Sequence, residues 1–124
     1  LAESECIACR FDQAHDIGTQ GLTLSRELSM KTEEGKCLRI LGDIAMSTGD
    51  LDKAKPYLDE SLQVLEEVGN AYPLARTRFS LAQWHARQGQ PAVAKAILEQ
   101  CMPVFEEMDA RMDLDNANQL LAGL

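Results

Sequence analysis

Apolar residues recur along this chain at intervals of three or four positions, in successive blocks separated by short polar breaks. This spacing is typical of helices that bury one face. In the block from 31 to 48, for example, Leu38, Leu41 and Ala45 share a face. No alternating strand pattern appears. The pattern predicts helices over residues 31–48, 51–68, 71–88, 91–108 and 111–122, preceded by a helix over 11–29 and the end of another over 1–8.

Short turns separate the predicted helices. Gly49 supplies the left-handed conformation that ends a helix, and Asp50 can cap the helix that follows. Asn70 is a good N-cap after Gly69, and Pro91 occupies a first helical position, where its missing N–H costs nothing. Because the connections are this short, we expect consecutive helices to pack side by side and run antiparallel.

The chain also repeats itself with a period of 40 residues. Residues 35–74 and 75–114 share nine identities in one ungapped register. A period of 20–50 residues indicates stacked supersecondary units. The identical pairs are Leu41 and Leu81, Gly49 and Gly89, Ala54 and Ala94, Lys55 and Lys95, Leu58 and Leu98, Val64 and Val104, Glu66 and Glu106, Glu67 and Glu107, and Leu74 and Leu114.

The composition narrows the classes of partner. The 124 residues carry a net charge of −8, which argues against nucleic acid or an anionic membrane surface as the main partner. No apolar run is long enough to span a bilayer, and no signal peptide is visible. The pattern of the four cysteines, at positions 6, 9, 37 and 101, favours a reducing cytosol, so we expect a cytoplasmic protein. Because the chain starts at Leu1, we expect it to be cut from a longer one.

The cysteine pattern offers one candidate for metal or redox chemistry. Cys6 and Cys9 form a C-x-x-C motif. A zinc site usually needs a second cysteine or histidine pair, and a thioredoxin-like site follows a strand; the sequence shows neither. Two cysteines three positions apart on a helix are more often small packing residues, with a metal or redox role as the minor alternative. Cys37 and Cys101 lie on apolar helix faces. The sequence therefore predicts no metal and no cofactor.

The repeating residues resemble those of the tetratricopeptide repeat family. The resemblance rests on Leu41-Gly42, Ala45, Gly49-Asp50, Ala54, Leu58 and Ser61-Leu62, and again on Leu81-Ala82, Gly89, Ala94, Leu98 and Cys101-Met102. It implies an all-α solenoid of antiparallel helix pairs, with about six helices. The units are a partial repeat over 1–30, repeats over 31–70 and 71–110, and a lone first helix over 111–124.

Two features depart from the common family pattern. Leu38 and Arg78 stand where many repeats carry an aromatic residue, and the period is 40 instead of 34. The longer period is similar to arrays in large bacterial signalling ATPases and transcription regulators, and to arrays that bind polarity or G-protein regulatory peptides. The resemblance thus implies a non-catalytic scaffold that binds a protein or peptide, within a larger signalling protein.

In such arrays the first helices line a concave groove. Residues of the first helices that packing does not require form one stripe. Its basic residues and Phe79 predict an acidic ligand with a hydrophobic residue; the alternative is a solvated face with local pairs such as Arg39 with Asp43. A Lys/Asn clamp for chaperone C-termini is not expected, since Ile40 and Asp43 occupy its places. The groove candidates are Lys36, Arg39, Asp43, Met46, Arg76, Phe79, Gln83, Asn116 and Gln119.

Residues that could carry catalysis do not cluster. His15 and His85 are isolated in the sequence, and the adjacent glutamates 66–67 and 106–107 diverge around their helices. An enzyme is not expected. Two other functions stay open: a sensor that binds a small molecule between repeats, and self-association through the terminal helices. The second would use apolar residues such as Leu114, Leu121 and Leu124, which lack a capping repeat, to form a homodimer.

Overall fold

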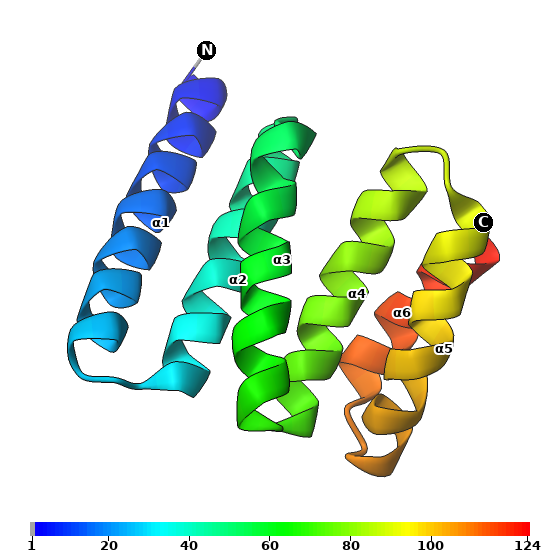
Figure 1. The fold of residues 1–124 in the computed structure, drawn as a ribbon. Helices are drawn as coiled ribbons and strands as arrows, with labels where there is room; N and C mark the ends of the chain where they lie inside the picture. The colour runs from blue at the N-terminus through cyan, green and yellow to red at the C-terminus, as the bar shows by residue number, and fades with distance from the viewer. Residues whose placement is uncertain (1) are drawn as a thin grey trace.

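A computed structural model describes residues 2–124 of the chain, with side chains from Asp12 onward. It is built from helices joined by short turns (Figure 1), and the five helices from residue 31 onward begin and end within one residue of their predicted bounds. The helices are α1 (Ala2–Glu27), α2 (Lys31–Ser47), α3 (Leu51–Val68), α4 (Ala71–Arg87), α5 (Pro91–Glu107) and α6 (Arg111–Ala122).

The first helix differs from the prediction. Instead of one helix ending near residue 8 and another beginning near residue 11, α1 runs without a break from Ala2 to Glu27. The helix continues because the sequence there contains no helix-breaking residue. Residues 6–11 contain no Gly, Asn, Asp or Pro, so no residue there favours the left-handed conformation that ends a helix.

The turns after the first five helices share one backbone feature. A residue with positive φ follows each of the first five helices, at positions spaced by 20. Gly49, Gly69 and Gly89 take this conformation without cost, whereas Ser29 (φ 56°) and Asp109 (φ 54°) carry a Cβ into it. The positions are therefore set by the 20-residue spacing of the helices and only partly by the residue type.

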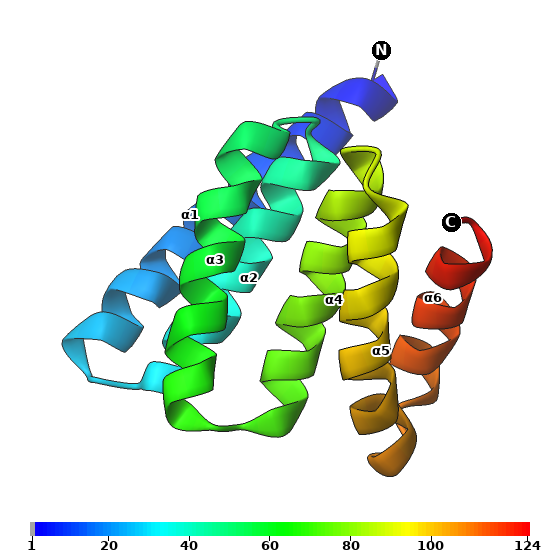
Figure 2. The same cartoon turned by 45° about the vertical axis from the view of Figure 1, so that its right-hand side comes forward.

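The helices form a curved, two-layer array. Figures 1 and 2 show α2 and α3, and α4 and α5, running antiparallel as hairpins. Among the described residues, α4 packs against both α2 and α6, whereas the backbones of α1, α3 and α5 do not approach one another as closely. The array therefore bends toward α2, α4 and α6, which line its concave face. None of the described helices is long and apolar enough to cross a membrane.

Small residues let the helices of a hairpin approach closely. A Cβ added to Gly42 would lie 2.7 Å from Leu58, and one added to Gly35 would lie 2.5 Å from Leu65. One repeat later Ala82 and Ala75 take these positions, and both are fully buried. Gly42 and Ala82 therefore mark the point where the two helices of each hairpin come closest.

Buried hydroxyl groups link successive hairpins. Ser61 Oγ donates to the carbonyl oxygen of Gly35 over 2.7 Å and lies 3.0 Å from Thr77 Oγ1, so one chain of hydrogen bonds joins α2, α3 and α4. Both hydroxyl side chains are inaccessible to solvent. Because an unpaired buried hydroxyl is costly, these bonds fix the register of the three helices.

Candidate functional site: the concave face

The groove candidates occupy equivalent positions on the concave helices. Lys36, Arg76 and Asn116 stand 40 residues apart and form one column across α2, α4 and α6. A second column contains Arg39, Phe79 and Gln119, and a third contains Asp43 and Gln83. Asn116 and Gln119 are exposed, and the side chains of Phe79 and Gln83 are partly buried.

Met46 is the exception among the candidates. Its exposed fraction is 4%, and it packs in the apolar cluster that contains Ala54, Leu58 and Leu81. The prediction that packing does not require Met46 is therefore wrong. The reason is the approach of α4: Arg87 Nη1 donates to the Met46 carbonyl oxygen over 2.7 Å, which holds the end of α2 against the end of α4.

Arg39 and Asp43 form an ion pair on α2. Arg39 Nη1 donates to Asp43 Oδ2 over 2.8 Å, and the side chain of Arg39 is 13% exposed. Burial lowers the pKa of Arg39 against the pull of Asp43, and burial raises the pKa of Asp43 against the neighbouring Ser80 hydroxyl and Arg39. Asp43 Oδ1 is buried and has no hydrogen-bond partner among the described side chains. The local pair considered for these two residues is thus present, and it is half-buried.

Arg76 reaches a second carboxylate on the next concave helix. Its Nε atom lies 3.7 Å from Asp113 Oδ1 on α6, and its guanidinium lies 5.9 Å from the centre of the Tyr72 ring. The Tyr72 hydroxyl donates to Asp113 Oδ2, and this hydrogen bond raises the pKa of Tyr72. Asp113 therefore joins α4 to α6 at the concave face.

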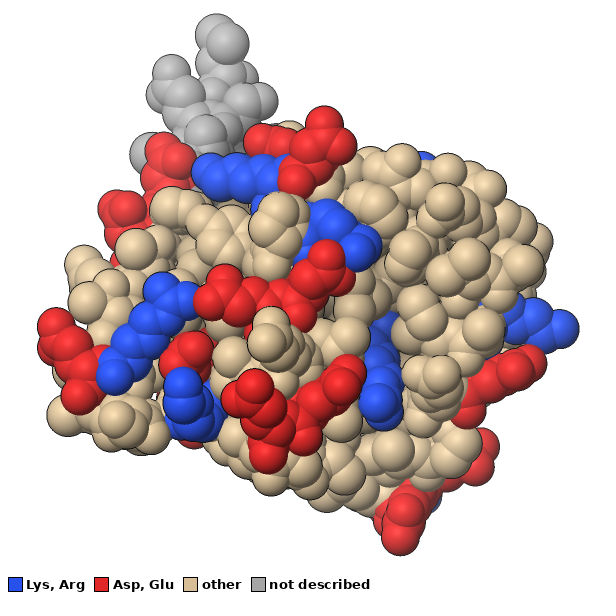
Figure 3. Space-filling model, in the orientation of Figure 1, with Lys and Arg blue, Asp and Glu red and all other residues tan. Residues whose placement is uncertain are grey.

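The charges of the concave face balance. Lys36 Nζ lies 3.6 Å from Glu33 Oε1, so each basic groove candidate has a carboxylate within 4 Å. Three cations thus face three carboxylates, and the basic character expected from the sequence is offset by Glu33, Asp43 and Asp113. The opposite, convex side mixes acidic and basic side chains as well, as Figure 3 shows over α1 to α3.

Sequence reasoning missed Tyr72, Ser80 and Asp113. Contacts between successive concave helices join residues 41 apart, as in Tyr72 with Asp113 and Met46 with Arg87. The charged contact of Arg76 with Asp113 spans 37 residues. A search of the sequence at the repeat length alone could not find them, because these contacts are offset from the 40-residue period, by one residue beyond it or three residues short of it.

Other candidates for chemistry stay separate from this face. His85 Nδ1 lies 2.7 Å from Gln90 Oε1 at a turn, and burial raises the pKa of Cys101 to about 11. The described residues contain no group of three or more potential metal ligands. The side chains of Cys6 and Cys9 lie outside the described ones, so their predicted packing role stays a prediction.

The fold and the concave face define a class of helical-hairpin repeat protein. Residues 36–107, from α2 to the end of α5, match the family model for the tetratricopeptide repeat. This match covers more than half of the chain, which therefore belongs to the tetratricopeptide repeat family. Repeats of this family generally mediate protein–protein interaction and are generally non-catalytic. A comparison with curated proteins found no match.

Proposed function

We propose that this chain is a non-catalytic scaffold whose concave face binds a segment of another protein. The observation that carries the proposal is the row of polar side chains that crosses α2, α4 and α6. Arg39, Asp43, Arg76 and Asp113 lie along it, held by hydrogen bonds and ion pairs within the protein. A row whose side chains are already held in place loses little side-chain entropy when a ligand binds.

The exposed cations of the concave face and their carboxylate partners indicate which kind of ligand fits. Lys36 and Arg76 are the more exposed cations, with 45% and 43% of their side chains accessible, and Phe79 offers a partly buried apolar surface. An acidic segment with one apolar residue fits these groups, but its carboxylates must compete with Glu33 and Asp113. We therefore expect modest affinity that falls with salt.

The wider role follows from the family and the period. We propose that the chain acts as a regulatory segment of a larger signalling protein in the cytoplasm, since the 40-residue period resembles arrays of that kind. Binding at the concave face would position a partner without chemistry at the site.

A selection from random displayed peptides tests the proposal. Peptides that bind the wild-type chain are retested on Arg76→Glu and on Asn116→Glu, which add negative charge to the concave face at partly or fully exposed positions. Lys95→Glu, an exposed change on α5 outside that face, is the matched control. We expect the concave variants to lose most of the binding and the control to keep it. Peptides that bind all three variants equally would contradict the proposal.

One observation favours a sensor as the second candidate. A cavity of about 300 Å³ lies among α1, α2 and α3, near the lower limit for small-molecule sites. Its described lining mixes Leu41 and Ile44 with Asp12, His15 and Lys53. This mixture fits a small amphipathic molecule that carries both charges, such as a free amino acid. Thermal shift with a panel of amino acids tests it, and an unchanged melting temperature with every member would reject it.

A further inference from the structure

A single aromatic side chain occupies the junction of α3, α4 and α5. Trp84 of α4 donates its indole N–H to the Leu51 carbonyl oxygen of α3 over 2.8 Å. Lys55 Nζ, also on α3, lies 5.3 Å from the centre of the Trp84 ring, within reach of a cation–π contact. Trp84 and Ile97 of α5 pack against the same apolar cluster. The junction therefore has a hydrogen-bonded indole ring as its filling.

The junction one repeat earlier carries an aliphatic residue in place of the tryptophan. Trp84 and two residues around it have equivalents 40 positions before them. The pairs are Trp84 and Ile44, Lys55 and His15, and Ile97 and Tyr57. All three earlier residues line the cavity of about 300 Å³ among α1, α2 and α3. The cavity thus lies at the position that corresponds to the tryptophan ring of the next repeat.

The inner wall of this cavity suits an aromatic ring. Leu41 and Ala45 of its described lining are buried, and Ile44 and Tyr57 are half-buried, so apolar side chains form most of the interior. Tyr57 adds a ring that can pack against another ring face to edge or offset. An apolar cavity of about 150 Å³ is large enough for benzene. The larger cavity here has room for a two-ring aromatic group.

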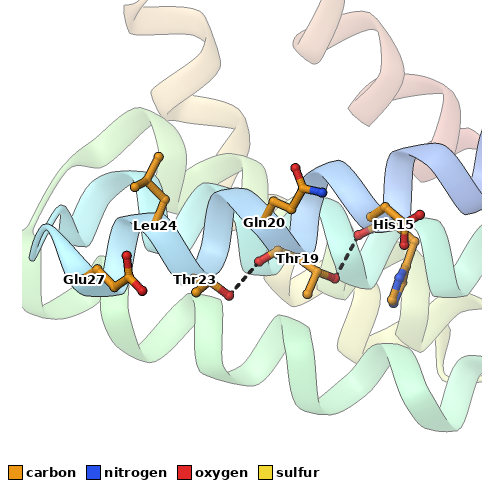
Figure 4. Close-up of a pocket in the computed structure, with 7 residues that line it drawn as sticks. His15, Thr19, Gln20, Thr23, Leu24 and Glu27 are labelled. Atoms are coloured by element: carbon orange, nitrogen blue, oxygen red, sulfur yellow. Dashed lines mark hydrogen bonds between the residues drawn. The ribbon is translucent and has the colours of Figure 1, made fainter.

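The wall also contains a buried polar atom without a partner. His15 Nε2 is buried, and no described group forms a hydrogen bond with it. The His15 ring lines the cavity, and Figure 4 shows it pointing away from Leu24 of the same helix. A neutral imidazole nitrogen accepts a hydrogen bond in one tautomer and donates one in the other. Because an unpaired buried nitrogen is costly, a ligand that bonds to it relieves that cost.

We propose that this cavity binds a small molecule with a planar two-ring aromatic group and a ring N–H, of the size of indole. The ring takes the place that Trp84 takes one repeat later, and its N–H donates to His15 Nε2. Exposed Asp12 and Lys53 pair with the ammonium and carboxylate groups of a ligand that carries them, such as tryptophan. This ligand class rests on the sensor function considered above and narrows its free amino acid to an aromatic one.

Titration of indole, tryptophan and leucine into isotope-labelled protein, followed through backbone amide shifts, tests the proposal. Ile44→Trp puts the side chain of the next repeat into the cavity. Ile40→Trp, the same exchange at a 40% exposed position of α2 outside the described lining, is the matched control. We expect indole and tryptophan to shift amides around His15, Ile44 and Tyr57 in wild type and control. Both should bind Ile44→Trp at least about tenfold more weakly.

The three probes separate the ligand class from the sensor function itself. If leucine shifts these amides and the aromatic probes do not, the cavity is a sensor site and the aromatic assignment is wrong. If no probe shifts them, the assignment is overturned, and the panel of amino acids decides separately on the sensor. Aromatic probes that bind Ile44→Trp as well as wild type would also overturn it, because the ring then lies elsewhere. The wild-type shifts decide the question even if Ile44→Trp folds poorly.

Discussion

Arg39 and Asp43 lie one turn apart on α2, with 2.8 Å between Nη1 and Oδ2, at the centre of the concave face. An exposed pair at this spacing contributes a few tenths of a kcal/mol. This one is different because 13% of the arginine side chain and 35% of the aspartate side chain are accessible. Loss of one partner therefore leaves the other charged, poorly solvated and without its hydrogen bond.

Removing the arginine alone should destabilise the fold more than removing both charges. We expect Arg39→Met to lower the free energy of unfolding by roughly 1–3 kcal/mol, and the double variant Arg39→Met/Asp43→Leu to recover most of that loss. Urea denaturation measures both. The exposed pair of Lys55 and Asp59, also at 2.8 Å, is the control, and Asp59→Asn should cost under about 0.5 kcal/mol. A double variant as unstable as Arg39→Met would contradict the view that the unpaired Asp43 carboxylate causes the loss.

Gly35 is a position where a single methyl group should damage the fold. A Cβ there would lie 2.5 Å from Leu65 Cγ, and both helices are fixed by the Ser61 hydrogen bond to the Gly35 carbonyl. Gly35→Ala gains helix propensity but forces α2 and α3 apart, so we expect a net loss of roughly 1–3 kcal/mol. Gly123→Ala, whose Cβ meets nothing closer than 3.6 Å, should change the melting temperature little. Equal stability of the two variants would disprove the close packing.

Glycine should stabilise the fold at the two turns that now carry a side chain at positive φ. Ser29 and Asp109 adopt φ values of 56° and 54°, which glycine takes without a steric penalty. We expect Ser29→Gly and Asp109→Gly each to raise stability by about 0.5–1 kcal/mol, because the steric relief exceeds the greater backbone entropy that glycine loses on folding. Gln100→Gly, at an exposed position in the interior of α5, should lower it instead. Thermal unfolding shows whether each change raises or lowers the melting temperature. Destabilisation by all three changes would contradict the view that a side chain at positive φ strains these turns.

Cys101 should make the fold sensitive to alkaline pH. Burial raises the pKa of this thiol from 9.0 to about 11, so the unfolded chain loses its proton first as pH rises. Stability is therefore fully present below the unfolded pKa of 9.0 and falls as the pH approaches the folded pKa of about 11, by roughly 1–3 kcal/mol. Urea midpoints measured across this window should fall more steeply for wild type than for Cys101→Ala. Parallel slopes would rule the thiol out as the cause.

Most of the helix order could be predicted because local signals agreed with the packing. Gly49, Gly69 and Gly89 mark three turns directly, and Asp50 caps α3 through a 3.1 Å hydrogen bond from the Lys53 backbone N–H, as predicted. Asn70 lies at the predicted N-cap of α4, but its side chain makes no capping hydrogen bond there. The long α1 was missed because the repeat predicted a turn where no residue favours one.

The concave face was harder to predict than the fold. Periodicity identifies equivalent positions on α2, α4 and α6, but it does not show which residues meet between helices. Met46 was misplaced because its side chain is buried in a cluster that includes Leu81 of α4, and this contact depends on how α2 and α4 cross. The balance of charge was missed because Asp113 approaches Arg76 from the next helix, 37 residues away.

The most direct test of the central claim is to map a bound peptide by NMR. A peptide selected on the wild-type chain is titrated into isotope-labelled protein, and backbone amide shifts are followed residue by residue. The account predicts that the largest shifts fall on α2, α4 and α6, around Arg39, Arg76 and Asn116, with α3 and α5 nearly unchanged. Shifts concentrated on the outer face of α1 or on α3 and α5 would contradict a concave binding site.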